Sequence, residues 1–354
     1  MKTLREFYRG RRVFVTGHTG FKGAWLSQML LLLGADVTGY ALSPPTEPAL
    51  FHLAHLDKHM ASITGDIRDF GKLRRAMEQA RPEIVLHLAA QPIVLEGYRD
   101  PRGTYETNVM GTVNLLECVK TLDCVRSVVN VTTDKVYRAH AGAYREEDTL
   151  DGRDPYSNSK SCSELVTGCY RNSFFAPAGS AGGGPPVSTM RSANVIGGGD
   201  FAASRILPDC VRAAMERHPL ALRHPDALRP YLHVLESLSA YLLLAMRQAE
   251  EPALAGAYNI GPDGAGCVRT EDLVRLFREA YGAPDYVAQR DAGAPYEADA
   301  LVLDCAKARR ALGWKPALSI GRAVALTADW TRAWLGGSDA GEVTRKQIAG
   351  YLRL

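Results

Sequence analysis

Short apolar runs alternate with helical patterns over the first 190 residues of the 354-residue chain. The runs are rich in Val and Ile and predict strands, at residues 13–16, 37–42, 62–64, 83–88, 127–131 and 187–191. Apolar residues at helical spacing predict long helices between them, at residues 24–33, 104–120 and 155–170. Alternating strands and helices predict an α/β fold with a doubly wound parallel sheet and right-handed crossovers.

The first predicted strand runs into a glycine-rich turn, GHTGFKG at residues 17–23, and then into a helix that we expect Gly34 to end. A strand, a Gly-x-x-Gly-x-x-Gly turn and a helix in this order are typical of a dinucleotide-binding site. The glycines allow backbone N–H groups and the helix N-terminus to approach a pyrophosphate. We therefore expect five turn residues to contact a dinucleotide: Gly17, Thr19, Gly20, Phe21 and Gly23.

The sequence is less informative about the part of the site that would bind the adenosine half of the cofactor. Where an acidic residue often binds the adenosine ribose, this chain has Ser43, so the choice between NAD and NADP stays open. Asp66 could accept a hydrogen bond from adenine or cap a turn before Asp69, which we expect to be a helix N-cap. Four more residues are expected beside the cofactor: Ile67, Leu88, Ala89 and Ala90. The two alanines are small enough for a cofactor ring to lie close to the backbone.

Three chemically active side chains, Thr133, Asp134 and Lys135, directly follow the apolar run at residues 127–131. Ligands of a parallel sheet bind at the carboxyl ends of its strands. A hydroxyl, a carboxylate and an amine at that edge could act as acid and base on a bound molecule. The alternative interpretation is a plain salt bridge between Asp134 and Lys135.

Tyr156 and Lys160 lie four residues apart in the helix predicted at residues 155–170, so both side chains share one helix face. A lysine ammonium beside a tyrosine favours the phenolate and is expected to lower the phenol pKa, which would make Tyr156 a usable base. The alternative is a surface pair, because the Tyr-x-x-x-Lys spacing also occurs by chance. We expect Thr133, Asp134, Lys135, Tyr156 and Lys160 to be catalytic.

Composition excludes several other classes of protein. Apolar residues make up 46% of the chain and charged residues 23%, as in ordinary globular proteins. The net charge of +3 gives no support for a nucleic-acid or anionic-membrane partner. The longest apolar runs are too short to span a bilayer, and the charged N-terminus lacks the apolar stretch of a signal peptide. Seven cysteines without a Cys-x-x-Cys pair indicate a reduced, cytoplasmic protein without a metal site.

With these motifs the chain resembles the extended short-chain dehydrogenase/reductase family and, within it, the CDP-glucose 4,6-dehydratases. Most nucleotide-sugar dehydratases have Thr-Asp-Glu where this chain has Thr133-Asp134-Lys135, and lysine in the third place is similar to the CDP-glucose enzymes. The resemblance covers nearly the whole length, in the stretches GHTGFKGAWL (17–26), PPTEPALF (44–51), DIRDF (66–70), HLAAQP (87–92), TNVMGTVNLLE (107–117), VNVTTDK (129–135), DPYSNSK (154–160), NVIGGGD (194–200), RPYLHVLE (229–236) and LGWKP (312–316).

The resemblance implies a Rossmann-type NAD-binding domain at residues 1–192 and a smaller α/β lobe at residues 193–354. That C-terminal lobe would bind the substrate, and part of it would return to the Rossmann sheet. The family pairs subunits through helices at residues 104–120 and 155–170, so a homodimer is expected. Substrate contacts are expected from six residues: Gln91, Asn194, Arg205, Arg229, His233 and Glu297. The two arginines could instead be solvated surface residues, and His233 could be a packing residue.

The implied activity is conversion of CDP-D-glucose to CDP-4-keto-6-deoxy-D-glucose with NAD that is recycled internally. Tyr156 would remove the 4-hydroxyl proton, with Thr133 hydrogen-bonded to the 4-oxygen and Lys160 on the nicotinamide ribose. Lys135 would then take the C5 proton, for which its amine must be neutral. A protonated Asp134 would donate to the departing 6-hydroxyl.

Several residues depart from the pattern of the CDP-glucose enzymes. Val136 replaces a usual cysteine, Phe201 and Tyr231 replace usual tryptophans, and the loop at residues 138–143 is short and lacks tryptophan. Three alternatives therefore stay open: a dehydratase of another nucleotide hexose, a nucleotide-sugar 4-epimerase, and a protein that binds NAD without turnover. An epimerase needs no acid and base at C5 and C6, so Asp134 and Lys135 argue against it.

Overall fold

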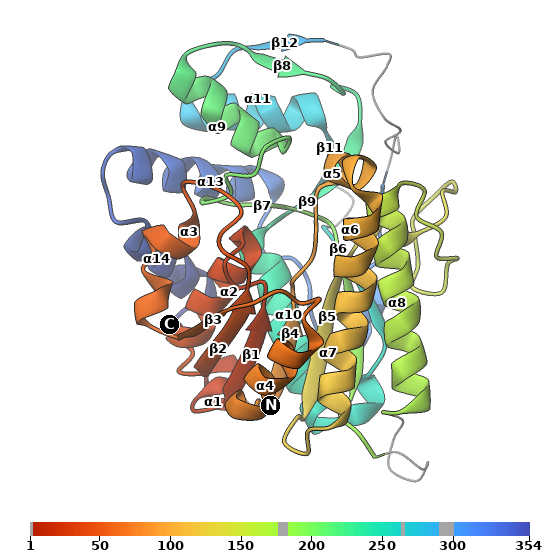
Figure 1. Cartoon of the computed structure of the whole chain (residues 1–354). Helices are drawn as coiled ribbons and strands as arrows, with labels where there is room; N and C mark the ends of the chain where they lie inside the picture. The colour runs from red at the N-terminus through yellow and green to blue at the C-terminus, as the bar shows by residue number, and fades with distance from the viewer. Residues whose placement is uncertain (1–2, 176–182, 263–265, 290–300) are drawn as a thin grey trace.

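A seven-stranded parallel sheet forms the centre of the protein in the computed structural model, which describes residues 3–175, 183–262, 266–289 and 301–354 (Figure 1). The strand order is β10-β6-β5-β4-β1-β2-β3, and every neighbouring pair is parallel. The predicted doubly wound sheet is thus confirmed. Its strands are β1 (Arg12–Thr16), β2 (Asp36–Ala41), β3 (Ala61–Thr64), β4 (Ile84–His87), β5 (Ser127–Thr133), β6 (Val187–Ser192) and β10 (Ala257–Ile260).

Helices cover both faces of this sheet because successive side chains of its strands point to opposite sides. Val13 and Val15 of β1 belong to the core beneath α2, α10 and α14, whereas Phe14 belongs to the core beneath α4, α7 and α8 (Figure 1). The covering helices are α1 (Leu4–Tyr8), α2 (Phe21–Leu32), α4 (Phe70–Ala80), α7 (Gly111–Lys120), α8 (Pro155–Ser173), α10 (Val234–Glu250) and α14 (Ala340–Leu352).

Capping residues mark the helix ends, and two of them, Asp69 and Gly34, were predicted from the sequence. The Asp69 carboxylate accepts from Lys72 N at the start of α4, and that of Asp154 from Ser157 N at the start of α8. Gly34, with φ of +83°, follows the last residues of α2. Shorter elements connect the layers: α3 (Leu50–Leu53), η1 (Leu56–Lys58), α5 (Val94–Arg99), η3 (Asp134–Val136), η4 (Pro252–Leu254) and α12 (Ala306–Leu312).

The prediction of one regular helix at residues 104–120 is wrong in detail. The segment is helical from α6 (Pro101–Tyr105) through α7, but a π-helical turn, η2 (Glu106–Met110), interrupts it. Within that turn, Asn108 accepts from Gln91 N at 2.8 Å and donates to Gln91 O at 3.0 Å and to Ser159 Oγ at 2.9 Å. The widened turn thus places an amide side chain that fixes the loop after β4, as π turns at functional sites often do.

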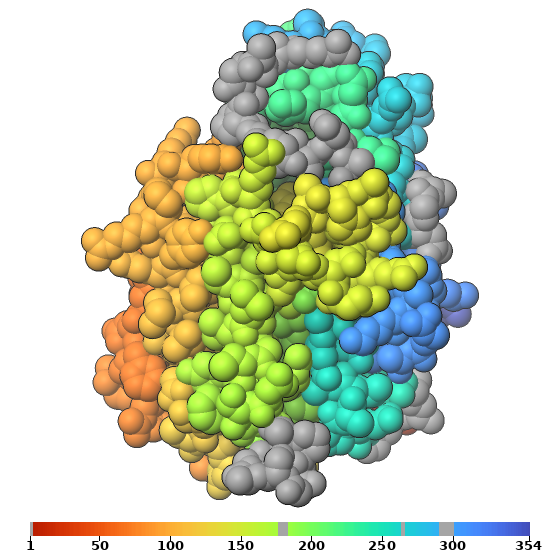
Figure 2. Space-filling view, turned by 90° about the vertical axis from the view of Figure 1, so that its right-hand side faces the viewer, coloured from red at the N-terminus to blue at the C-terminus, as the bar shows by residue number. Residues whose placement is uncertain are grey.

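The chain after residue 193 divides between the sheet domain and a smaller lobe that stands above it (Figure 2). Strand β10 pairs with β6, and α10 packs on β5. The lobe has its own apolar core, which includes Leu207, Leu273 and Val324. Its elements are β7 (Asn194–Ile196), β8 (Leu220–Leu222), β9 (Leu228–His233), β11 (Cys267–Arg269), β12 (Tyr286–Ala288), α9 (Ile206–Glu216), α11 (Thr270–Tyr281) and α13 (Ile320–Leu335).

Two kinds of feature are absent from the described ranges. None of their helices has both the length and the apolar character needed to cross a membrane. None of their His, Cys, Asp and Glu residues form a group that could hold a metal ion.

A buried ion pair joins α8 to the centre of the sheet. Arg191 of β6 donates to Glu164 of α8 at 2.8 Å, and their side chains are 4% and 2% exposed. The other acceptor positions of Glu164 are also used, by the hydroxyl of Thr189 at 2.7 Å and by that of Thr132. Because Thr132 lies on β5, the carboxylate of Glu164 connects helix α8 with two neighbouring strands.

Replacing Glu164 with Ala is expected to lower the free energy of unfolding by about 3–5 kcal/mol, because it leaves the Arg191 guanidinium buried without its counter-charge. Urea unfolding followed by circular dichroism measures the change. The matched control is Glu78→Ala, which removes the exposed pair with Arg74 (2.7 Å) and should cost at most about 0.5 kcal/mol. Equal unfolding midpoints for the two variants would contradict the structural role of the buried pair.

Candidate active site

The three polar residues at the end of β5 form one hydrogen-bonded cluster. Asp134 is 1% exposed, and its Oδ1 accepts from Thr133 Oγ1 and from Lys135 Nζ, both at 2.9 Å. Lys135 Nζ also donates to Oδ1 of Asn194, on β7, at 2.9 Å. Asp134 Oδ2 is buried and has no hydrogen-bond partner among the described residues. The structure thus brings Asn194 to the cluster as expected and leaves one buried carboxylate oxygen of Asp134 without a partner among the described residues.

Tyr156 and Lys160 face the same cluster from the first turns of α8. Pro155 begins this helix, and Asp154 caps it, so the backbone around Tyr156 is fixed. Lys160 Nζ donates to Val131 O of β5 at 3.1 Å, and Tyr156 is hydrogen-bonded to the hydroxyl of Thr133. Both side chains are buried, which excludes the alternative of a surface pair.

The prediction of a lowered pKa for the Tyr156 phenol is wrong. Burial raises the pKa of Tyr156 to about 12, because desolvation disfavours the phenolate. The Thr133 hydroxyl and the Arg205 guanidinium oppose this rise. Burial also lowers the pKa of Lys160 to about 8, against the opposite effect of Glu164. The phenol is therefore protonated at neutral pH.

The glycine turn after β1 has the shape that a pyrophosphate site requires. Gly17 has φ of +76°, and a Cβ there would lie 2.7 Å from Ala89 N. A Cβ at Gly23 would lie 2.1 Å from Gly17 O, so side chains at both positions would open the turn. Gly20 is the N-cap of α2 and provides no side-chain cap, and a Cβ there would meet only Gly17 O, at 3.6 Å. The N–H groups of α2 are thus accessible to an anion.

The other expected cofactor residues lie around this turn with partners of their own. Thr19 Oγ1 donates to Leu42 O at 2.9 Å, and the N–H groups of Leu88 and Ala89 both donate to Thr16 Oγ1 at 3.1 Å. Ile67 belongs to the core beneath α4 and α7. Phe21 is the first residue of α2, and Ala90 follows Ala89 in the loop after β4.

Asp66 forms a local ion pair. Its carboxylate accepts from Arg68 N at 2.9 Å and from the Arg68 guanidinium at 2.6 Å, and these contacts lower the pKa of Asp66. Of the two interpretations left open by the sequence, the local turn is therefore observed, while an adenine contact stays a prediction.

The expected substrate residues separate into two groups. Asn194 and Arg205 lie at the cluster: Arg205 is the N-cap of α9, pairs with Asp200 at 2.9 Å, and is close enough to Tyr156 to lower its pKa. Gln91 donates to Thr104 Oγ1 at 2.8 Å and holds its own loop. Arg229, on β9, is buried.

His233 has the packing role that the sequence left open. Its ring is buried against the edge of Trp25, and its Nδ1 accepts from Leu235 N at 3.3 Å as the N-cap of α10. Burial lowers the pKa of His233 to about 3, so the ring is neutral. Glu297, the sixth residue expected to contact substrate, lies outside the described residues.

Sequence reasoning missed one residue of the site, Lys22. It occupies the second position of α2, and its ammonium interacts electrostatically with Arg205, Lys160 and the Asp134–Lys135 pair. The signal was present in the sequence, because Lys22 lies inside the glycine turn. Its side chain could not be placed without the fold that brings α8 and α9 to the same point.

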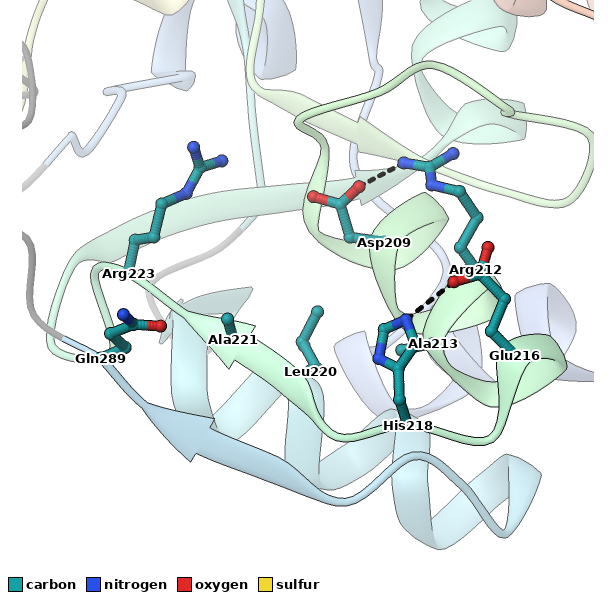
Figure 3. A pocket seen from close by; sticks show the side chains of 9 residues that line it. All are labelled: Asp209, Arg212, Ala213, Glu216, His218, Leu220, Ala221, Arg223 and Gln289. Atoms are coloured by element: carbon teal, nitrogen blue, oxygen red, sulfur yellow. Dashed lines mark hydrogen bonds and ion pairs between the residues drawn. The ribbon is translucent and has the colours of Figure 1, made fainter.

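A separate pocket of about 510 Å³ lies in the smaller lobe (Figure 3). It is formed by α9, by residues around β8 and by Gln289, and shares no residue with the cluster at Tyr156. Its charged residues are largely paired with one another, Asp209 with Arg212 and Glu216 with His218 (Figure 3). We therefore assign the chemistry to the cluster and not to this pocket.

Three comparisons place the chain among known proteins. A model of the family described as GDP-mannose 4,6 dehydratase matches residues 14–327. The CDP-glucose 4,6-dehydratase of Salmonella typhimurium is 44% identical over 351 residues, 98% of each chain. The UDP-glucose 4-epimerase of Mycolicibacterium smegmatis is 27% identical over 91% of this chain and 98% of its own. The crystal structure of a dTDP-glucose 4,6-dehydratase from Bacillus anthracis has a TM-score of 0.76 at 21% identity, covering 93% and 99% of the two chains, and supports the fold.

Proposed function

The chain belongs to the GDP-mannose 4,6-dehydratase family, and we propose that it converts CDP-D-glucose to CDP-4-keto-6-deoxy-D-glucose. The observation that carries the proposal is the cluster at the end of β5, where the Asp134–Lys135 pair lies beside Thr133 and the buried Tyr156. The same residues provide a base for an alcohol and an acid–base pair for loss of water. The 44% identity to a CDP-glucose 4,6-dehydratase over nearly the whole chain supports CDP-glucose as substrate.

The glycine turn and the start of α2 fit the pyrophosphate of NAD, because their N–H groups are accessible and side chains at Gly17 and Gly23 are sterically excluded. When bound, NAD supplies a hydride acceptor for C4 and later a hydride donor for C6, so the overall reaction involves no net redox change. Lys160, which reaches Val131 O from α8, would hold the nicotinamide ribose.

In the first step Tyr156 accepts the proton of the sugar 4-hydroxyl. Its raised pKa means that only a small part of the phenol is ionised at neutral pH. The Thr133 hydroxyl and the Arg205 guanidinium both favour the phenolate. These two residues therefore increase the fraction of Tyr156 that is ionised, against the larger opposite effect of burial. With substrate bound, Thr133 would donate its single hydroxyl proton to the 4-oxygen of the sugar in place of Asp134 Oδ1, its acceptor in this structure.

In the second step the C5 proton and the 6-hydroxyl must leave. Lys135 donates to Asp134 Oδ1 at 2.9 Å, so its ammonium cannot accept a proton in this state. Transfer of one proton along this hydrogen bond would produce a neutral amine and a protonated carboxyl together. The pair would then be the base for C5 and the acid for the 6-hydroxyl.

The alternatives from the sequence are less well supported. A 4-epimerase would need Tyr156 but would have no use for an Asp134–Lys135 pair. A protein without turnover would not need the buried contact between Thr133 and Tyr156. The replaced positions Val136 and Tyr231 are buried in apolar cores, and Phe201 packs on Trp330 and Trp334. A panel of nucleotide hexoses tests the remaining alternative, a dehydratase that acts on another hexose or carries another nucleobase in its substrate.

A homodimer formed through α7 and α8 is part of the proposal. Leu165 on α8 is 60% exposed, and Met110, just before α7, is 50% exposed. Exposed apolar side chains on neighbouring helices are typical of subunit interfaces. Light scattering should give the mass of two chains, and Leu165→Glu should give the mass of one. A wild-type mass of one chain would contradict the pairing.

The reaction is tested by incubating the protein with NAD and each of several nucleotide hexoses and measuring product mass. Loss of one water from CDP-glucose is expected, and an isomer of unchanged mass would contradict the proposal.

Tyr156→Phe should reduce turnover by at least about 100-fold, because it removes the base. Lys135→Ala should still allow the absorbance of reduced nicotinamide to appear while water loss stops. Full dehydration by Lys135→Ala would overturn its role as base.

The rate of C4 oxidation in a single turnover should rise between pH 6 and pH 8, because burial keeps the Tyr156 phenol protonated and only the phenolate accepts the proton. Thr133→Val removes a hydrogen bond that lowers the phenol pKa, so its profile should shift to higher pH by roughly one unit. Thr133→Ser keeps the hydroxyl and should retain the wild-type profile. Coincident profiles for the Val variant and the wild type would show that Thr133 does not tune the base.

A further inference from the structure

The side chain of Lys22 extends from the glycine turn toward the catalytic cluster. Its backbone belongs to the first turn of α2, whose N–H groups face the expected pyrophosphate site. Its partly buried side chain extends toward charged residues from three other segments. The charged groups that face its ammonium are Arg205 at the start of α9, Lys160 on α8, and Asp134 and Lys135 on η3. The ring centroid of Tyr241, on α10, is 5.9 Å from Nζ.

The charges of this cluster do not balance. Four cationic side chains converge here, and two of them have their own carboxylate at 2.9 Å, Lys135 with Asp134 and Arg205 with Asp200. Lys160 Nζ donates to the Val131 carbonyl and has Glu164 one turn further along its helix. For Lys22, no carboxylate or carbonyl in the described part of the chain accepts a hydrogen bond from the ammonium. The cluster thus has an excess of positive charge at Lys22.

This environment changes the protonation of Lys22. Burial lowers its pKa to about 7, and the nearby Arg205 and Lys160 act in the same direction, while Asp134 opposes them. An amine with this pKa is about half protonated at neutral pH. A nearby negative charge would reverse the shift, since it favours the ammonium.

We propose that Lys22 binds the diphosphate group of a ligand and takes up a proton as the ligand binds. A diphosphate supplies the missing negative charge and accepts charge-assisted hydrogen bonds from an ammonium. The inference rests on the proposed function, because NAD and a nucleotide sugar are both diphosphate diesters. The side chain starts on the helix that would hold the cofactor, and its ammonium interacts with Arg205 at the start of α9, so either diphosphate could be its partner.

Isothermal titration calorimetry in two buffers of different ionisation enthalpy measures the protons taken up on binding. NAD and CDP-glucose are titrated separately, so no reaction occurs, and neither diester titrates near neutral pH. At pH 8 an amine with a pKa of about 7 is mostly neutral, so uptake should approach one proton, falling to about a tenth of a proton at pH 6. Uptake with only one of the two ligands identifies the diphosphate that Lys22 contacts.

Two variants of the same residue separate charge from proton uptake. Lys22→Met should abolish the uptake and weaken binding of that ligand by about ten- to hundredfold. Lys22→Arg keeps a permanent charge, so it should bind the ligand without the pH-dependent uptake. Lys58→Met, at an exposed site on η1, is the matched control and should behave like the wild type.

Absence of uptake with both ligands, or uptake that persists in Lys22→Met or Lys22→Arg, would overturn the assignment. If Lys22→Met does not fold, Lys22→Arg alone decides. The proposed function fails in a different way: NAD and CDP-glucose both bind, at least one of them with proton uptake through Lys22, yet mixing them with the protein gives no loss of water. If neither ligand binds, both proposals are wrong.

Discussion

The buried ion pair between Glu164 and Arg191 is the interaction on which the proposed active site depends. It holds α8 against β5 and β6, and these elements carry the groups that have to meet. Thr133 comes from the end of β5, and Tyr156 and Lys160 come from α8. A small shift of this helix would separate Tyr156 from the Thr133 hydroxyl. Glu164 also acts on the pKa of Lys160 one turn away, so the same carboxylate supports both the geometry and the electrostatics.

The site combines strong burial with closely packed charges. Burial keeps the Tyr156 phenol protonated and lowers the pKa values of Lys160 and Lys22, to about 8 and about 7. Each of these groups is therefore sensitive to a ligand that brings charge or removes water. The Asp134–Lys135 pair differs from these groups, because it needs no proton from outside the pair. One proton moved along its existing hydrogen bond would convert the ion pair into a base and an acid. In the proposed reaction, binding would change the protonation of the cluster before chemistry begins.

The sequence predicted the parts of this arrangement that depend on local patterns. The parallel strands, the glycine turn, the cap at Asp69, the helix end at Gly34 and the polar end of β5 all follow from periodicity and spacing. The π-helical turn at Glu106–Met110 could not be predicted in this way, because it depends on contacts of Asn108 with a distant loop and with α8. The raised pKa of Tyr156 was missed because spacing places a lysine nearby but does not reveal how completely the phenol is desolvated. Lys22 was missed for the related reason that its charged neighbours come from three other segments.

The most direct test of the central claim is to follow deuterium from C4 of CDP-glucose in the presence of unlabelled NAD. An internally recycled 4,6-dehydratase moves the deuteride from C4 to C6, so the product should lack one water and carry deuterium in its new methyl group. A product of unchanged mass with deuterium still at C4 would contradict the account and favour an epimerase. Deuterium lost to free reduced cofactor would also contradict it, because the hydride would not have returned to the sugar.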